Sequence, residues 1–347
     1  MNRSTLAAVA IIAVIAIGGL SAYYFLGTGG TLSPTSSNTA STTTTSSSAA
    51  PSEPFKVKAG DSFPFAEQFF LVEMAGQDKG YYKNNYVQPE FSSFRGSSRL
   101  YEAVAAGQVN IGYGICSDVI AYRTMGVPVK VLATYVTGNP WRVLVKGDSP
   151  LQSAKDLSGK RVGTSGVRGI DHLLGVLIEN KYGIKMEFVP MGGVPEMLAG
   201  IKSGSIDAFI QTPGPTQGLV EAGQLKVLVE TDNAVPKPWP TFCVWATDDM
   251  IKNNGDAVSR FVKATLESVQ YAQTNPDYTT SLYVKRTNAS QTIAGKVVGD
   301  IQWQPSGVIS EEGVNNIIAA DKQGGDISAN STVRAQEVYT NQFITKP

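Results

Sequence analysis

The residues best suited to chemistry lie in the stretch 155–174, KDLSGKRVGTSGVRGIDHLL, where a strand-like segment leads through a glycine-bearing turn into an apolar helix. Such a turn places unpaired backbone N–H groups at a helix N-terminus, which favours an anion. Thr164, Ser165 and Gly166 would add hydroxyl and backbone donors, and Arg168 a positive charge. Arg168 fits an exposed surface residue equally well.

Neither common nucleotide-binding pattern fits this turn. No lysine follows the glycines as a P-loop requires, and the spacing of Gly163, Gly166 and Gly169 is not that of the dinucleotide-binding pattern. The turn therefore suits a small sulfonate, nitrate or carboxylate better than a nucleotide.

Catalytic and metal-binding patterns are weak. His172 follows Asp171, but adjacent helical residues point in different directions, and no G-x-S-x-G nucleophile turn accompanies them. One histidine and two distant cysteines, Cys116 and Cys243, do not form a usual zinc site. We expect no catalytic residue, metal or cofactor, and the two cysteines form either a disulfide or two buried thiols.

The N-terminal region predicts export and tethering. Residues 6–26 carry no charge, and about 20 apolar residues suffice to cross a bilayer. Arg3 predicts a cytoplasmic N-terminus and an extracellular body, although a cleaved signal is the alternative. Residues 31–54, rich in Ser, Thr, Ala and Pro, predict a disordered stalk. Asn288 and Asn330 fit the N-glycosylation pattern.

The net charge of zero argues against nucleic-acid binding.

From residue 55 onward, strand-like and helix-like patterns alternate, which predicts an α/β fold with largely parallel sheets. Two segments, EAVAAGQVNIGYG at 102–114 and EMLAGIKSGSIDAFIQT at 196–212, repeat the order of helix, glycine-rich turn and apolar strand. We therefore expect two similar lobes, the second inserted into the first.

Four segments carry a resemblance to a known family: MAGQDKGYYKNN, the pair AAGQVNI and KSGSIDA, SAKDLSGKRVGTS, and TFCVWAT. In order and spacing they resemble the solute-binding proteins of ABC importers, in the branch for nitrate, taurine, alkanesulfonates and thiamine-pyrimidine precursors. The resemblance covers about residues 55–345 and implies a type II periplasmic-binding fold with two crossing segments. The expected domains are an anchor (1–30), a linker (31–54), lobe 1 (55–138 and 241–347) and lobe 2 (139–240).

In such folds ligands bind beyond the carboxyl ends of the strands. This places the candidate ligand-binding residues at the ends of predicted strands and at one crossing segment. They are Ser62, Phe63, Phe65, Ser97, Ser98, Cys116, Ser117, Asn139, Trp141, Thr164, Ser165, Gly166, Arg168, Gln211 and Thr212. Several fit structural roles equally well, such as helix capping by a serine or core packing by Trp141.

The expected function is capture of a small anionic or polar solute between two closing lobes and its delivery to an ABC permease and its ATPase. The alternatives are a thiamine-pyrimidine-precursor binding protein or synthase of the same fold, and a membrane-tethered ligand sensor. The synthases of this family require a reactive histidine, a cofactor lysine and a cysteine-rich element, which this composition does not favour.

Overall fold

The computed structural model describes residues 53–62, 67–94, 96–167 and 169–344. The predicted anchor (residues 1–30) and nearly all of the predicted stalk (31–54) lie outside these ranges, so both stay predictions. Within the described ranges, no helix combines the length and apolar character that crossing a bilayer requires.

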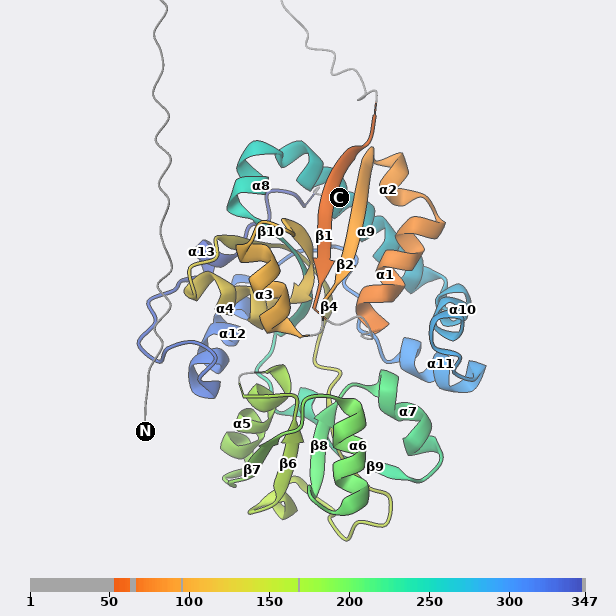
Figure 1. Cartoon of the computed structure of the whole chain (residues 1–347), viewed down its shortest axis with the longest axis vertical. Coiled ribbons are helices and arrows are strands. Elements are labelled where there is room, and N and C mark those ends of the chain that lie inside the picture. Colours follow the sequence, from red (N-terminus) through yellow and green to blue (C-terminus); the bar gives the residue numbers. More distant parts are fainter. Residues whose placement is uncertain (1–52, 63–66, 95, 168, 345–347) are drawn as a thin grey trace, which may run out of the picture. The chain divides into compact units, whose positions relative to one another are not determined.

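The first sheet contains five strands in the order β2-β1-β3-β10-β4 (Figure 1). β1 is parallel to β2 and β3, whereas β10 is antiparallel to both β3 and β4. The strands are β1 (Phe55–Asp61), β2 (Val87–Ser93), β3 (Ile111–Ile115), β4 (Val129–Thr137) and β10 (Pro240–Thr247). β3 is buried at every position, and β10 at all but its last, as expected for central strands covered by helices on both faces.

The second sheet repeats this arrangement in the order β7-β6-β8-β5-β9. β6 is parallel to β7 and β8, and β5 is antiparallel to β8 and β9. The strands are β5 (Arg142–Lys146), β6 (Arg161–Thr164), β7 (Glu187–Pro190), β8 (Ala208–Gln211) and β9 (Leu225–Glu230). The expectation of largely parallel sheets needs one qualification: the fourth strand in each order, β10 or β5, is antiparallel to both of its neighbours. We call the elements on the first and second sheets the first and second lobes.

The helices connect and cover these strands. In the first lobe, α1 (Glu67–Asp78) packs against α9 (Gly255–Thr274), whose buried face includes Val258, Phe261, Val262, Thr265 and Val269. The other helices are α2 (Tyr81–Asn84), α3 (Ser97–Ala105), α4 (Cys116–Thr124), α5 (Ile170–Tyr182), α6 (Val194–Ser203), α7 (Pro213–Glu221), α8 (Asp248–Asn253), α10 (Pro276–Thr287), α11 (Gln291–Gly299), α12 (Glu311–Gly324) and α13 (Ala335–Val338), with 3-10 turns at Ala154–Leu157 and Thr231–Asn233.

The helix after α9 begins as the sequence indicates, with Pro276 in its first turn. Asn275, however, does not cap this helix with its side chain, because its amide donates to the carbonyl of Tyr271 at the end of α9.

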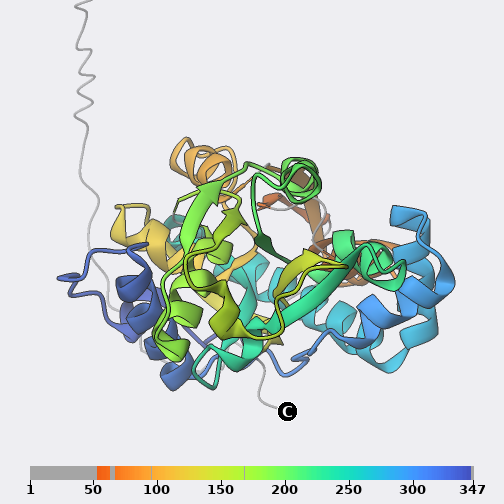
Figure 2. The same cartoon turned by 90° about the horizontal axis from the view of Figure 1, so that it is seen from below.

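The chain passes from the first sheet to the second between Thr137 and Arg142 and returns between Glu230 and Pro240. The two crossings bind each other, since the backbone N–H of Asn139 donates to Asp232 (2.6 Å) and the Thr231 hydroxyl donates to Asn139 (2.6 Å). Helices from outside the second lobe also contact it: α12 packs against α5, and α11 lies beside α7 (Figure 2).

Two glycines let β1 and β3 approach each other near the carboxyl end of the sheet. Gly60 and Gly112 are partners in the register, and a Cβ on Gly112 would lie 1.9 Å from the carbonyl oxygen of Gly60. Because the obstacle is backbone, it has little freedom to move away.

We expect Gly112→Ala to lower the free energy of unfolding by more than about 3 kcal/mol, because the strands must separate to admit the methyl group. Urea unfolding measures the loss. Gly295→Ala on α11, where an added Cβ meets nothing within 4 Å, is the control and should stabilise by up to about 1 kcal/mol. Equal midpoints for wild type and Gly112→Ala would contradict the close approach.

Candidate functional site

The candidate site lies where the parallel strands of both sheets end and the next helices begin. β1 leads toward α1, β3 into α4, β6 toward α5 and β8 into α7. Buried polar side chains gather at these junctions: Asp61, Ser62, Glu67, Gln68, Ser117, Thr164, Asp171 and Thr212. Buried polar groups need partners, so their concentration here marks this edge as the place where a ligand would be recognised.

The turn before α5, predicted to hold an anion, is occupied by a carboxylate of the protein itself. Asp171 accepts hydrogen bonds from the backbone N–H of Ser165 (2.5 Å), the Ser165 hydroxyl (2.9 Å) and the N–H of His172 (3.0 Å). Thr164 is 1 % exposed, and its hydroxyl donates over 3.3 Å to the carbonyl of Gly166. Arg168 lies outside the described residues. Asp171 therefore accepts hydrogen bonds from the N–H and the hydroxyl of Ser165, two donors that were predicted to bind a ligand.

The beginning of α4 is tied to two other elements through serine hydroxyls. Ser97 donates to the carboxylate of Asp118, and Ser117 donates to Oδ1 of Asp321 (2.7 Å). Tyr122 holds Ser97 in place by donating to its carbonyl (2.6 Å). Ser97 and Ser98 do not cap α3, because its N-cap is Gly96 and no side-chain cap bond forms there; Ser98 is exposed.

Three carboxyl groups, Asp118, Asp171 and Asp321, lie on α4, α5 and α12, and α12 packs against both of the other helices. The pKa of Asp118 is raised to about 7, chiefly by burial and also by the charges of Asp326 and Asp171. Burial also raises the pKa of Asp171 and Asp321, the second of which is fully buried. Among the described residues, no group of three or more such side chains is arranged to hold a metal ion.

A fourth carboxyl group connects the two lobes. Glu67, in the first turn of α1, is 1 % exposed and accepts from the backbone N–H of Gly214 (3.3 Å) near the start of α7. A Cβ on Gly214 would lie 2.3 Å from Oε2 of Glu67, so the contact requires glycine there. Burial raises the pKa of Glu67 to about 7, while the positive charge of Arg142 opposes the rise.

The residues predicted at the first crossing, Asn139 and Trp141, make structural contacts. Trp141 is 5 % exposed and stacks on Phe242, with ring centroids 5.7 Å apart. The Asn139 side-chain oxygen accepts from the Trp141 N–H and the Thr231 hydroxyl, while its amide nitrogen finds no partner.

The remaining predicted residues fall into four groups. Gln211 accepts from the N–H of Thr212 (2.8 Å), which keeps both at the end of β8. Ser62 is 1 % exposed and its hydroxyl has no hydrogen-bond partner. Cys116 is buried, and it and Cys243 are free thiols in the structure. Phe63 and Phe65 lie outside the described residues.

The structure also adds residues that the sequence did not single out for the site: Glu67, Asp118 and Asp321. A signal existed for the first two, because an acid in the first turn of a helix after a strand suggests a role at the helix N-terminus. Asp321 had no such signal, since it lies near the end of α12, 204 positions from Ser117.

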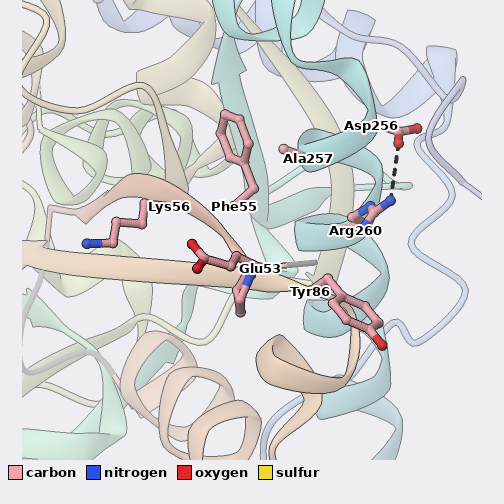
Figure 3. A pocket seen from close by; sticks show the side chains of 8 residues that line it. Glu53, Phe55, Lys56, Tyr86, Asp256, Ala257 and Arg260 are labelled. Carbon is pink, nitrogen blue, oxygen red and sulfur yellow. Dashed lines mark hydrogen bonds and ion pairs between the residues drawn. The ribbon is translucent and has the colours of Figure 1, made fainter. Parts of the chain in front are cut away.

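A cavity of about 350 Å³ lies elsewhere, near the amino-terminal ends of β1 and β2 (Figure 3). Phe55 and Tyr86 give it apolar walls, and Arg260 beside it pairs with Asp256 (3.2 Å). In open α/β sheets ligands bind at the opposite, carboxyl edge. The cavity therefore is not the predicted site.

Comparisons with known proteins agree with this architecture. A family model described as "NMT1/THI5 like" matches residues 70–279, more than half of the chain. The taurine-binding periplasmic protein of Escherichia coli (strain K12) is 25% identical over 211 residues, which cover 59% of this chain and 64% of that protein. The formylaminopyrimidine-binding protein of Halalkalibacterium halodurans is 23% identical over 220 residues, covering 62% and 66%. The chain thus spans slightly less than two thirds of each of these curated relatives.

The solved alkanesulfonate-binding protein SsuA from Xanthomonas axonopodis pv. citri, bound to MOPS, superposes with a TM-score of 0.70. Its sequence is 12% identical, and the alignment covers 84% of this chain and 99% of that one. At this identity the likeness shows the fold alone. Together these matches confirm the family resemblance inferred from the four sequence segments.

The raised pKa of Glu67 predicts how stability depends on pH. The folded protein retains a proton that the unfolded chain releases above its ordinary pKa of 4.5, so stability falls as pH rises from 4.5 through about 7. Asp118 acts in the same direction. We expect the urea midpoint to be lower at pH 8 than at pH 5, with a contribution from Glu67 of the order of 2 kcal/mol.

Glu67→Gln should flatten this dependence, whereas Glu102→Gln, which changes an exposed acid on α3, should leave it as in wild type. A wild-type stability that is constant or rises between pH 5 and pH 8 would contradict the burial of these acids.

Proposed function

Because the chain belongs to the NMT1/THI5-like family, we propose that it is the solute-binding component of an ABC importer and captures a small polar solute between its two lobes. The fold is the periplasmic solute-binding fold of ABC import systems. The names of the two relatives, for taurine and for a formylaminopyrimidine, support a solute of a few heavy atoms with polar groups.

The observation that carries the proposal is the repeated sheet arrangement with buried polar groups at both carboxyl edges. Ser62, Ser117 and Thr164 come from strand ends of the two sheets, and each is at least 95 % buried. A helix or strand edge that serves only packing has no need of such groups, since burying a hydroxyl without a good partner costs about 1–3 kcal/mol.

Closure of the lobes is the mechanism that this fold supports. Two short crossings join the sheets, and contacts such as Glu67 to Gly214 and Arg142 to Asp300 (2.6 Å) form between elements of different lobes. A solute that binds the closed arrangement more tightly shifts the population toward it. Delivery would then follow from docking of the closed protein on a membrane permease.

Binding is favoured over catalysis by the surroundings of the reactive side chains. The ring of His172 packs edge-on against Phe188, with centroids 4.7 Å apart, and burial lowers the pKa of His172. Cys243 is fully buried, and burial raises the pKa of its thiol well above the ordinary value. Neither group is poised as a base or a nucleophile.

A thermal-shift panel tests the proposal. We expect at least one of nitrate, ethanesulfonate, taurine, putrescine and 4-amino-2-methylpyrimidine to raise the melting temperature, because a ligand at 100 times its Kd stabilises the folded state by about 2.7 kcal/mol. The same ligand should reduce the scattering radius. No shift with any compound would contradict the proposed solute class.

A variant pair locates the site. Thr164→Val keeps the side-chain shape and removes the hydroxyl at the end of β6, so affinity should fall by up to about tenfold. Tyr86→Ala, which alters the cavity at the other edge of the sheet, should bind as wild type. Wild-type affinity in Thr164→Val together with weaker binding in Tyr86→Ala would place the site in that cavity.

A further inference from the structure

Near the helix N-termini at the strand ends, carboxylates of the chain itself accept hydrogen bonds from backbone N–H groups. Asp171 binds the N–H groups at the start of α5, and Glu67 binds Gly214 at the start of α7. Asp118 lies in the first turn of α4. An anionic solute at any of these places would have to displace a carboxylate or lie next to one, and like charges at short range repel by several kcal/mol in a buried setting.

Several buried acceptor atoms at the same junctions have no partner among the described residues. They are Oδ2 of Asp321, Oε2 of Glu67 and the hydroxyl of Ser62. All three residues are at least 98 % buried. An acceptor removed from water without a donor is costly, and it is satisfied when a ligand supplies N–H or O–H groups.

Asp321 and Ser62 reach one region from separate elements. Asp321 is held by Ser117 at the start of α4, next to Asp118. The carbonyl of Ser62 accepts from Gly96 (2.9 Å), which directly precedes Ser97, the hydroxyl partner of Asp118. Unpaired acceptors thus come to this corner from the end of β1 and from α12.

Carboxyl groups rather than cations act on one another in this corner, and without a ligand their raised pKa favours the protonated form. The charges that act on Asp118 and Asp321 are those of other carboxyl groups, including Asp326. The described guanidinium that acts on Glu67, Arg142, is itself paired with Glu230 (3.2 Å) and Asp300 (2.6 Å). The described part of the site therefore has more carboxyl groups than cations, and a ligand with N–H donors would supply the partner that Oδ2 of Asp321 lacks and take the place of a retained proton.

We propose that the solute carries a protonated amine or another nitrogen with several N–H donors, which binds between Asp118 and Asp321, and that anions without such a nitrogen are not bound. This narrows the expectation of a small anionic or polar solute to one that carries such a nitrogen. It rests on the proposed function, because it names the class of solute for the same site.

The test compares probes that differ in the amine. Taurine is ethanesulfonate with an added ammonium group, so this pair isolates the nitrogen; nitrate, putrescine and 4-amino-2-methylpyrimidine complete the set. We expect one or more nitrogen-bearing probes to raise the melting temperature, and neither nitrate nor ethanesulfonate to do so. Stabilisation by ethanesulfonate or nitrate equal to or above that by the nitrogen-bearing probes would overturn the inference while leaving the proposed function standing. Failure of every probe would contradict the proposed function itself.

Asp321→Asn removes the charge and keeps the side-chain shape. We expect it to weaken the binding of the nitrogen-bearing probe at least tenfold by calorimetry, while the melting temperature without ligand is unchanged or higher, because an amide is uncharged and its burial carries no cost of desolvating a charge. Asp256→Asn, which neutralises an exposed acid on α9, is the matched control and should bind as wild type.

Unchanged affinity in Asp321→Asn would assign Asp321 to packing alone and overturn the inference. If this variant does not fold, Ser117→Ala provides the second measurement, because it removes the hydroxyl that orients Asp321. It should then weaken the same probe several-fold, and wild-type affinity in Ser117→Ala would overturn the inference.

Discussion

The start of a helix leaves backbone N–H groups without intrahelical partners, and in this protein such ends follow the parallel strands of both sheets. The chain meets this constraint with its own acids. Asp171 binds the donors of α5, and Glu67 reaches from α1 to the start of α7. Each acid is removed from water to do so, which raises its pKa, and Oε2 of Glu67 is left without a hydrogen-bond partner among the described residues.

The same acids tie the fold together. Glu67 joins the first lobe to the second through Gly214, and Tyr283 donates to the carbonyl of that glycine (3.0 Å). Ser117 and Asp321 join α4 to α12, which also packs against α5. A ligand that supplied donors to these carboxyl groups would therefore act on contacts between elements of both sheets, and binding and lobe closure would be coupled through the same atoms.

Much of the fold follows from periodicity. The alternation of strand and helix predicted the α/β class, and the apolar strands expected near the ends of the segments 102–114 and 196–212 are β3 and β8. The antiparallel direction of β5 and β10 was not predicted, because a hydrophobic pattern does not specify the direction of a strand within its sheet.

The site was harder to predict because its chemistry depends on contacts between distant segments. Local sequence places Thr164 and Ser165 at a strand end and suggests that their N–H and hydroxyl groups can bind an anion. In the structure, Ser165 instead donates to Asp171. Asp321 and Ser117 are 204 positions apart in the sequence, and Glu67 and Gly214 are 147 positions apart. A local sequence pattern cannot predict either contact.

A crystal structure of the protein with a nitrogen-bearing solute tests the central claim most directly. The account predicts that a solute nitrogen lies about 3 Å from Oδ2 of Asp321, with Asp171 still bound to Ser165. An anionic group bound to the N–H groups of Ser165 and His172, with Asp171 displaced from them, would contradict it.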